Sequence, residues 1–127
     1  SDVYKRQDVC VPISKITECV KFAEEQAEKF GVRAPMVGHM GDGNFHVVLP
    51  YDPAKKEMYK QIRAFNDTLI KKALELNGTI TGEHGVGLHK KEYLLEQHPD
   101  NIPVMKSIKR TLDPNNIMNP GKIFDLN

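Results

Sequence analysis

Two glycine-rich segments of this 127-residue chain carry three histidines and a glutamate, residue types that bind divalent metals. Residues 38–46 read GHMGDGNFH, and residues 78–87 read GTITGEHGVG. Imidazole and carboxylate groups beside tight turns are what a divalent metal site with an adjacent base requires. The candidate chemistry of the chain therefore lies in these two segments.

The first segment contains two histidines on either side of a turn signal. Asp42-Gly43 is typical of a two-residue type I′ hairpin turn, and in that hairpin His39 lies directly opposite His46. Opposed Cβ atoms are about 4.5–5.5 Å apart, so both imidazoles can reach one ion. Met40 and Phe45 would then point to the other face, toward apolar packing. The alternative is an ordinary turn whose histidines are simply polar strand residues.

The second segment offers the remaining ligand. Glu83 completes a set of two histidines and one carboxylate, which leaves metal positions open for water or substrate. His84 is either a fourth ligand or a base beside the metal. The glycines at 82, 85 and 87 let the backbone turn sharply and approach a ligand closely. The alternatives are an ordinary loop or a weak phosphate-binding loop, but neither G-x-G-x-x-G nor the Walker pattern is present.

Apolar periodicity predicts the elements that position these segments. We expect strands at residues 9–12, 36–39 and 45–49, a short β-like run at 79–81, and helices at 16–30, 52–76, 89–97 and 100–112. Gly31 is the expected C-cap of the first helix, and Asp52 and Pro53 are expected to begin the second. The β-α-β-β-α-β order predicts an α+β fold, an antiparallel sheet covered by helices on one face, with a C-terminal helical tail.

Composition excludes several classes of protein. Charged residues make up 28% and the net charge is +1, which gives no reason to invoke nucleic acid or an anionic membrane. No apolar run approaches the roughly 20 residues of a transmembrane helix. Cys10 and Cys19 lie outside any CxxC spacing and indicate reduced thiols. We expect a cytoplasmic protein, or a mitochondrial matrix protein in a eukaryote, with peripheral membrane association left open.

The motifs together resemble the C-terminal part of the FAD-linked 2-hydroxy-acid dehydrogenases and oxidases. This group includes D-lactate dehydrogenase, glycolate oxidase and D-2-hydroxyglutarate dehydrogenase, and residues 45–48 are most similar to the D-lactate dehydrogenase branch. Residues 38–46, 78–87 and 112–122 match in order, and residues 8–14 resemble the strand and helix start before them. We therefore expect residues 1–7 to be a leader or cloning remnant outside the family. Residues 8–112 would be part of a ferredoxin-like cap domain for substrate and metal, and residues 113–127 a segment that returns to an FAD domain absent from this chain.

The resemblance also implies roles for individual residues. Positions matching His39, His46 and Glu83 bind a divalent ion, usually zinc or manganese, and the position matching His84 is the base. Asn119 and Lys122 are candidate FAD contacts, and a plain anchoring loop is the alternative for that segment. The resemblance also bears on the substrate. Val48 occupies a position where the hydroxyglutarate branch has a polar residue that contacts the substrate. An apolar residue there disfavours a substrate with a second carboxylate.

The implied reaction is oxidation of a small 2-hydroxy acid to a keto acid. His84 would take the hydroxyl proton and FAD the C2 hydride, and the later electron acceptor is left unassigned. Because the chain holds a proton acceptor but no hydride acceptor, we expect it to be inactive by itself. One alternative is a free-standing metal-binding α+β module without redox activity. Another is a homodimer that packs through an exposed sheet face.

Overall fold

The computed structural model describes residues 3–127. The chain forms two compact units, Ser1–Glu83 and His84–Asn127. Both histidines of the first glycine segment and Glu83 therefore belong to the first unit, whereas His84 begins the second. The boundary that we expected after Leu112, between a cap-domain portion and a segment that returns to an FAD domain, stays a prediction.

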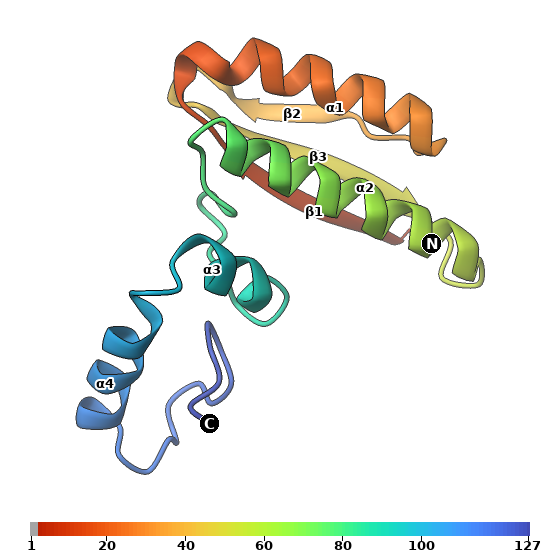
Figure 1. Ribbon diagram of the computed structural model, residues 1–127. Coiled ribbons are helices and arrows are strands. Elements are labelled where there is room, and N and C mark those ends of the chain that lie inside the picture. The colour runs from red at the N-terminus through yellow and green to blue at the C-terminus, as the bar shows by residue number, and fades with distance from the viewer. Residues whose placement is uncertain (1–2) are drawn as a thin grey trace. The chain divides into compact units, whose positions relative to one another are not determined.

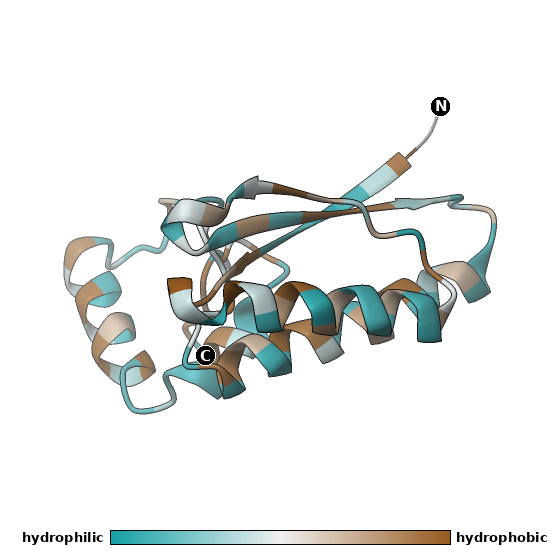
Figure 2. Cartoon of the chain, turned by 90° about the horizontal axis from the view of Figure 1, so that it is seen from above, coloured by the Kyte–Doolittle hydropathy of each residue, from teal (hydrophilic) through white to brown (hydrophobic). Residues whose placement is uncertain are grey.

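The first unit is a three-stranded antiparallel sheet covered by helices on one face. The strands β1 (Val3–Cys10), β2 (Met36–His39) and β3 (Asn44–Tyr51) lie in the order β1-β3-β2 (Figure 1). The helices α1 (Ile16–Phe30) and α2 (Lys56–Glu75) both lie on the same side of this sheet (Figure 2). The predicted α+β class is confirmed. Among residues 3–127, no helix combines the length and the apolar character needed to cross a membrane.

The core lies between the sheet and the two helices. Alternate residues of β3 are fully buried, and they pack against apolar stripes of the helices: Phe45, Val47 and Leu49 from β3, Ile16, Cys19 and Ala23 from α1, and Ile62, Phe65 and Leu69 from α2. These helical residues follow the spacing of 3 or 4 that predicted the helices. Burial raises the pKa of the Cys19 thiol to about 11, so this cysteine is protonated and inert.

Two of the expected strands are wrong in extent. The first strand was expected at residues 9–12, but β1 begins at Val3 because every residue of it pairs with β3, from Val3 opposite Tyr51 to Cys10 opposite Asn44. Residues 4–7 are mostly polar and did not predict a strand, but their pairing with β3 places them in one. The fourth strand is reduced to a single bridge between Cys10 and Thr79. Gly78 and Gly82 bracket this bridge and leave too few residues for a ladder.

The second helix begins later than Asp52 and Pro53 predicted. Asp52 Oδ1 accepts a hydrogen bond from Ala54 N–H at 3.0 Å, so it caps a turn rather than the helix itself, which starts at Lys56. The Gly31 cap is confirmed, since Gly31 has φ 65° and its N–H donates to the carbonyls of Ala27 and Glu28.

The second unit contains α3 (Lys91–Gln97), α4 (Ile102–Leu112) and the C-terminal segment. Both helices begin two residues later than expected. After α4 the chain turns at Asp113, whose buried carboxylate accepts hydrogen bonds from the N–H groups of Ile117 at 3.0 Å and Met118 at 2.9 Å. The ammonium of Lys109, followed by these N–H groups, lowers the pKa of Asp113 to about 2.

Candidate metal centre

The face of the sheet away from α1 and α2 carries the polar residues of β3. Side chains alternate along a strand, so burial of Phe45 and Val47 against the helices directs Asn44 and His46 to the opposite face. In the register, His46 lies between Asp8 of β1 and Val37 of β2. The hairpin and its partner strand thus place one histidine on the central strand of the face opposite α1 and α2.

The hairpin differs from the expected two-residue turn. Residues Met40–Asp42 form a 3₁₀ turn and Gly43 has φ 80°, so four residues connect β2 to β3. His39 consequently lies opposite Asn44 rather than His46. A shift of two residues keeps both histidines on one face, and their rings meet edge to face with centroids 6.1 Å apart. The prediction that His39 lies directly opposite His46 is wrong, but the two imidazole rings are neighbours.

The same change of register alters the prediction for the residues beside the turn. Phe45 is fully buried, as expected, whereas Met40 is 41% exposed. Met40 is part of the 3₁₀ turn rather than of a strand. It therefore has no strand face to share with Phe45.

Glu83 completes a cluster of three ligand-type side chains. Its Oε1 lies 3.3 Å from His46 Nε2. Single ligand atoms of His39, His46 and Glu83 all lie within 4.8 Å of one another. The first unit thus brings together the three residues that the two glycine segments predicted, although their role as ligands stays a prediction.

The geometry of the cluster fits a divalent ion. Two ligand atoms on a tetrahedral ion with bonds of about 2.0–2.1 Å are about 3.3 Å apart, which is the distance between His46 Nε2 and Glu83 Oε1. Within the described residues, Asn44 Oδ1 is a buried acceptor that receives no hydrogen bond. A buried oxygen of this kind needs a donor or a cation. The donor set of two imidazoles and a carboxylate suits zinc or manganese.

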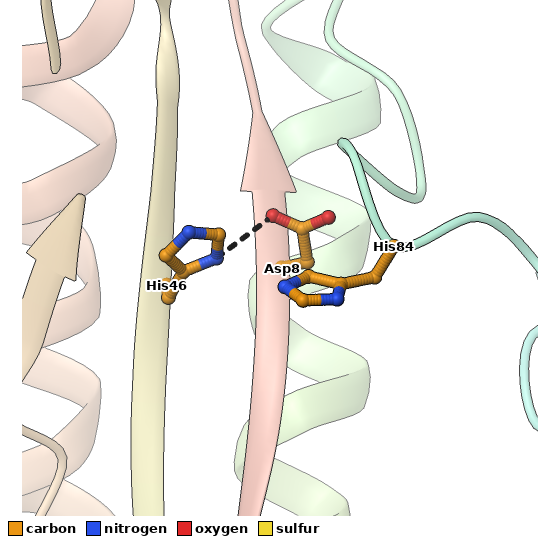
Figure 3. Close-up of side chains that lie close together, drawn as sticks. All are labelled: Asp8, His46 and His84. Carbon is orange, nitrogen blue, oxygen red and sulfur yellow. Dashed lines mark ion pairs between the residues drawn. The ribbon is translucent and has the colours of Figure 1, made fainter. Parts of the chain in front are cut away.

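Asp8 is a member of the site that our sequence reasoning missed. Its side chain is 3% exposed, and Oδ1 lies 3.1 Å from His46 Nδ1 (Figure 3). Its Oδ2 accepts a hydrogen bond from the backbone N–H of Gly82 at 2.8 Å. The signal in the sequence was an acidic residue directly before the apolar run at 9–11. Its place in the site follows only from the pairing of β1 with β3.

His84 is exposed and directly follows Glu83 in the chain. Asn119 and Lys122, the candidate FAD contacts, lie in the C-terminal segment of the second unit. There they line a pocket of about 140 Å³ together with Lys109 and Asn116. Asn119 has a φ of 47°, and its carbonyl accepts a hydrogen bond from Lys122 N–H at 3.3 Å.

Comparison with known proteins identifies the family. Residues 3–123 match the family described as FAD linked oxidases, C-terminal domain. This match includes residues 3–7, which we expected to lie outside the family, and those residues belong to β1.

Relatives of known name support this match. The chain is 42% identical to the probable mitochondrial D-lactate dehydrogenase of Danio rerio, over 94% of this chain and 24% of that protein. It is 41% identical to the mitochondrial D-lactate dehydrogenase [cytochrome] of Arabidopsis thaliana, over 92% and 21%. It is 40% identical to the glycolate oxidase subunit GlcD of Bacillus subtilis, over 93% and 25%. The chain thus spans about a quarter of the length of these relatives.

A solved structure agrees at the level of the fold. The 4-ethylphenol oxidase of Gulosibacter chungangensis, in its isoeugenol complex, matches with a TM-score of 0.63 and 21% identity, over 98% of this chain and 25% of that one. The family match and the identity to these relatives show the family. The chain belongs to the FAD linked oxidases, as their C-terminal domain.

Proposed function

We propose that this chain is the C-terminal part of a flavin- and divalent-metal-dependent dehydrogenase of D-2-hydroxy acids resembling D-lactate. The observation that carries the proposal is the convergence of His39, His46 and Glu83 on the face of the sheet opposite α1 and α2. It occurs in a chain whose relatives bear the names D-lactate dehydrogenase and glycolate oxidase. Those names describe a small 2-hydroxy acid as the substrate.

Three residues of the first unit hold the metal in this proposal. His46 and Glu83 contribute the atoms that already lie 3.3 Å apart, and His39 contributes the third ligand from the exposed rim. A bound zinc or manganese ion supplies Lewis acidity that lowers the pKa of the substrate's 2-hydroxyl. Three protein ligands would leave room at the ion for oxygen atoms of the substrate.

His84 is the base that takes the hydroxyl proton. It follows Glu83 directly, and one residue of extended chain spans about 3.3–3.6 Å, so it stays near the ligand it follows. Histidine is the side chain that most often acts as a general base. The flavin, when bound, supplies the hydride acceptor for C2. Removal of the hydroxyl proton by His84, together with loss of a hydride from C2 to such an acceptor, would convert the hydroxy acid to its keto acid.

The face opposite α1 and α2 also favours a substrate with one carboxylate. Arg6 lies opposite Val48 in the register of β1 and β3. It therefore shares a face with Asp8 and His46 and places one cation about two residues from the metal ligands. Val48 is apolar and offers no hydrogen bond to a second carboxylate. A short acid such as lactate fits this combination better than a dicarboxylic one.

The second unit contributes the contact with the flavin-binding part. Asn119 and Lys122 contact FAD in this proposal, from the pocket that they line. Three apolar residues at helical spacing on α4, Val104, Ile108 and Leu112, are 59%, 55% and 77% exposed. Exposed apolar faces of this kind indicate interaction surfaces. In this proposal the flavin-binding part, which belongs to the other three quarters of the relatives' length, packs against this face of α4.

The first test is metal content, measured by mass spectrometry on the purified chain. We expect about one zinc or manganese ion per chain, lost in His46→Ala and His39→Ala. His89→Ala, which removes an exposed histidine outside the cluster, is the matched control. Full retention of the metal in His39→Ala would exclude this residue as a ligand.

The second test is activity after the chain is joined to the flavin-binding part of a relative. The reconstituted protein is expected to oxidise D-lactate with FAD, and His84→Ala to lose turnover while keeping its metal. Loss of metal in His84→Ala would make this residue a ligand instead of the base. Metal binding without any FAD-dependent turnover would favour the alternative of a metal-binding module.

A further inference from the structure

A single buried carboxylate connects the two segments that supply the metal ligands. Asp8 lies on β1, with its side chain only 3% exposed. One oxygen faces His46 Nδ1 at 3.1 Å, and the other accepts the N–H of Gly82 at 2.8 Å. Burial of a carboxylate is costly unless it is paired and hydrogen-bonded, so these contacts constrain all three residues together.

The contact with Asp8 determines what the other ring nitrogen of His46 can do. Asp8 Oδ1 and His46 Nδ1 lie 3.1 Å apart without the alignment of a hydrogen bond. A buried carboxylate oxygen this close favours a proton over a lone pair on Nδ1, and the neutral ring then has its lone pair on Nε2. That atom is the one that faces Glu83 at 3.3 Å. A lone pair and a carboxylate oxygen repel one another unless a cation lies between them. The Nδ1 contact therefore selects the tautomer that binds a metal.

The contact with Gly82 positions the residue next to it, Glu83. A Cβ at Gly82 would lie 2.7 Å from Asp8 Oδ2 and 2.8 Å from Asn44 Oδ1. Only glycine lets the backbone come this close to the carboxylate. The hydrogen bond from Gly82 N–H thus fixes where the chain carrying Glu83 passes over the sheet.

We propose that Asp8 is a positioning residue of the metal centre, which holds His46 in its metal-binding tautomer and ties the Gly82-Glu83 backbone to the sheet. The proposal rests on the proposed function of the cluster as a metal site. Asp8 itself contacts neither metal nor substrate in this role. Carboxylates beside a ligand histidine typically change metal affinity by roughly 10- to 100-fold when they are removed.

The first experiment titrates the chain with Co²⁺ and follows its visible absorption. Asp8→Ala is expected to weaken Co²⁺ binding by roughly 10- to 100-fold. Asp8→Asn keeps an acceptor oxygen and should recover part of the affinity. The control is Asp42→Ala, which removes an exposed carboxylate of the 3₁₀ turn and should change affinity little. Equal affinities of Asp8→Ala and Asp42→Ala would overturn the proposal.

A second pair of variants disturbs the same contact and leaves the carboxylate in place. Gly82→Ala puts a Cβ against Asp8 and is expected to weaken Co²⁺ binding. Gly41→Ala is the matched control, because a Cβ there meets nothing within 4 Å. If both glycine variants bind Co²⁺ as the original chain does, Gly82 does not position Glu83.

Nitrogen NMR of the His46 ring separates this proposal from that of the metal site. Without metal, and at a pH where imidazole is neutral, the ring is expected to carry its proton on Nδ1. Asp8→Ala should shift it toward the Nε2-protonated form, and Asp8→Asn should largely restore it. If the Asp8 variants change the ring in this way but the original chain binds no Co²⁺, the metal site is rejected and the positioning role is kept. A ring unaffected by Asp8→Ala would reject the positioning role whether or not metal binds.

Discussion

Replacement of Gly43 tests the turn that places the two histidines side by side. Gly43 has φ 80°, and a Cβ on it would lie 2.3 Å from the carbonyl oxygen of Val11. The two residues are also tied by a hydrogen bond from Val11 N–H to Gly43 O at 2.9 Å. Alanine at this position therefore meets both an unfavourable backbone conformation and a backbone oxygen that cannot rotate away.

The loss of stability in Gly43→Ala is the sum of a conformational cost and a steric cost. The left-handed conformation costs a residue other than glycine about 1–2 kcal/mol, and forced overlap in a packed region costs about 1–3 kcal/mol. Gly43→Ala should thus lower the free energy of unfolding by about 2–5 kcal/mol. Asparagine tolerates the left-handed conformation, so Gly43→Asn retains mainly the steric term of about 1–3 kcal/mol.

Urea unfolding followed by far-UV circular dichroism measures these differences, as shifts in midpoint at constant slope. Gly41→Ala, in open space within the same turn, is the control and should change stability by less than about 1 kcal/mol. A type I′ turn, which the sequence predicted, would accept asparagine at this position. A Gly43→Asn chain as stable as the original would therefore refute the packing of this turn against Val11.

Three further predictions concern stability and reactivity. The pKa of Asp113 is lowered to about 2, so its stabilising contribution is present above the ordinary value of 3.8 and lost as pH falls toward 2. Amide exchange of the C-terminal segment should accelerate over that range, with no such step in Asp113→Asn. Leu69→Ala should lower the free energy of unfolding by about 2–5 kcal/mol, and Leu112→Ala, at a residue 77% exposed, by less than about 0.5 kcal/mol. With a pKa of about 11, Cys19 should react with a disulfide reagent only after denaturation, whereas the half-buried Cys10 should react in the native chain.

The periodic helices were predictable from sequence because burial itself produces their pattern. Ile62, Phe65 and Leu69 recur at helical spacing and all three are buried. Gly31 ends α1 as expected, since a left-handed C-cap is a local requirement that glycine meets. Helix starts were less predictable: Asp52 makes a local turn as readily as a cap, and only packing decides which it does.

The candidate site was likewise only partly predictable from the sequence. The residue types in the two glycine segments identified His39, His46 and Glu83, because few other side chains can bind a divalent ion. The register between the histidines was wrong, since a 3₁₀ turn replaced the two-residue turn. Both turns suit Asp42-Gly43 locally. The choice between them depends on the contact of Gly43 with Val11, which belongs to a different part of the chain.

Sequence alone therefore determined the fold class, the buried faces of the long helices and the residue types of the candidate ligand set, because each depends on local composition and spacing. Tertiary structure decided the length of β1, the register of the hairpin and the membership of Asp8 in the site. Asp8 is 38 residues from His46 and 74 from Gly82 in the chain, and β-pairing brings it to both. Long-range pairing of this kind depends on the packing of the whole sheet, which no local pattern contains.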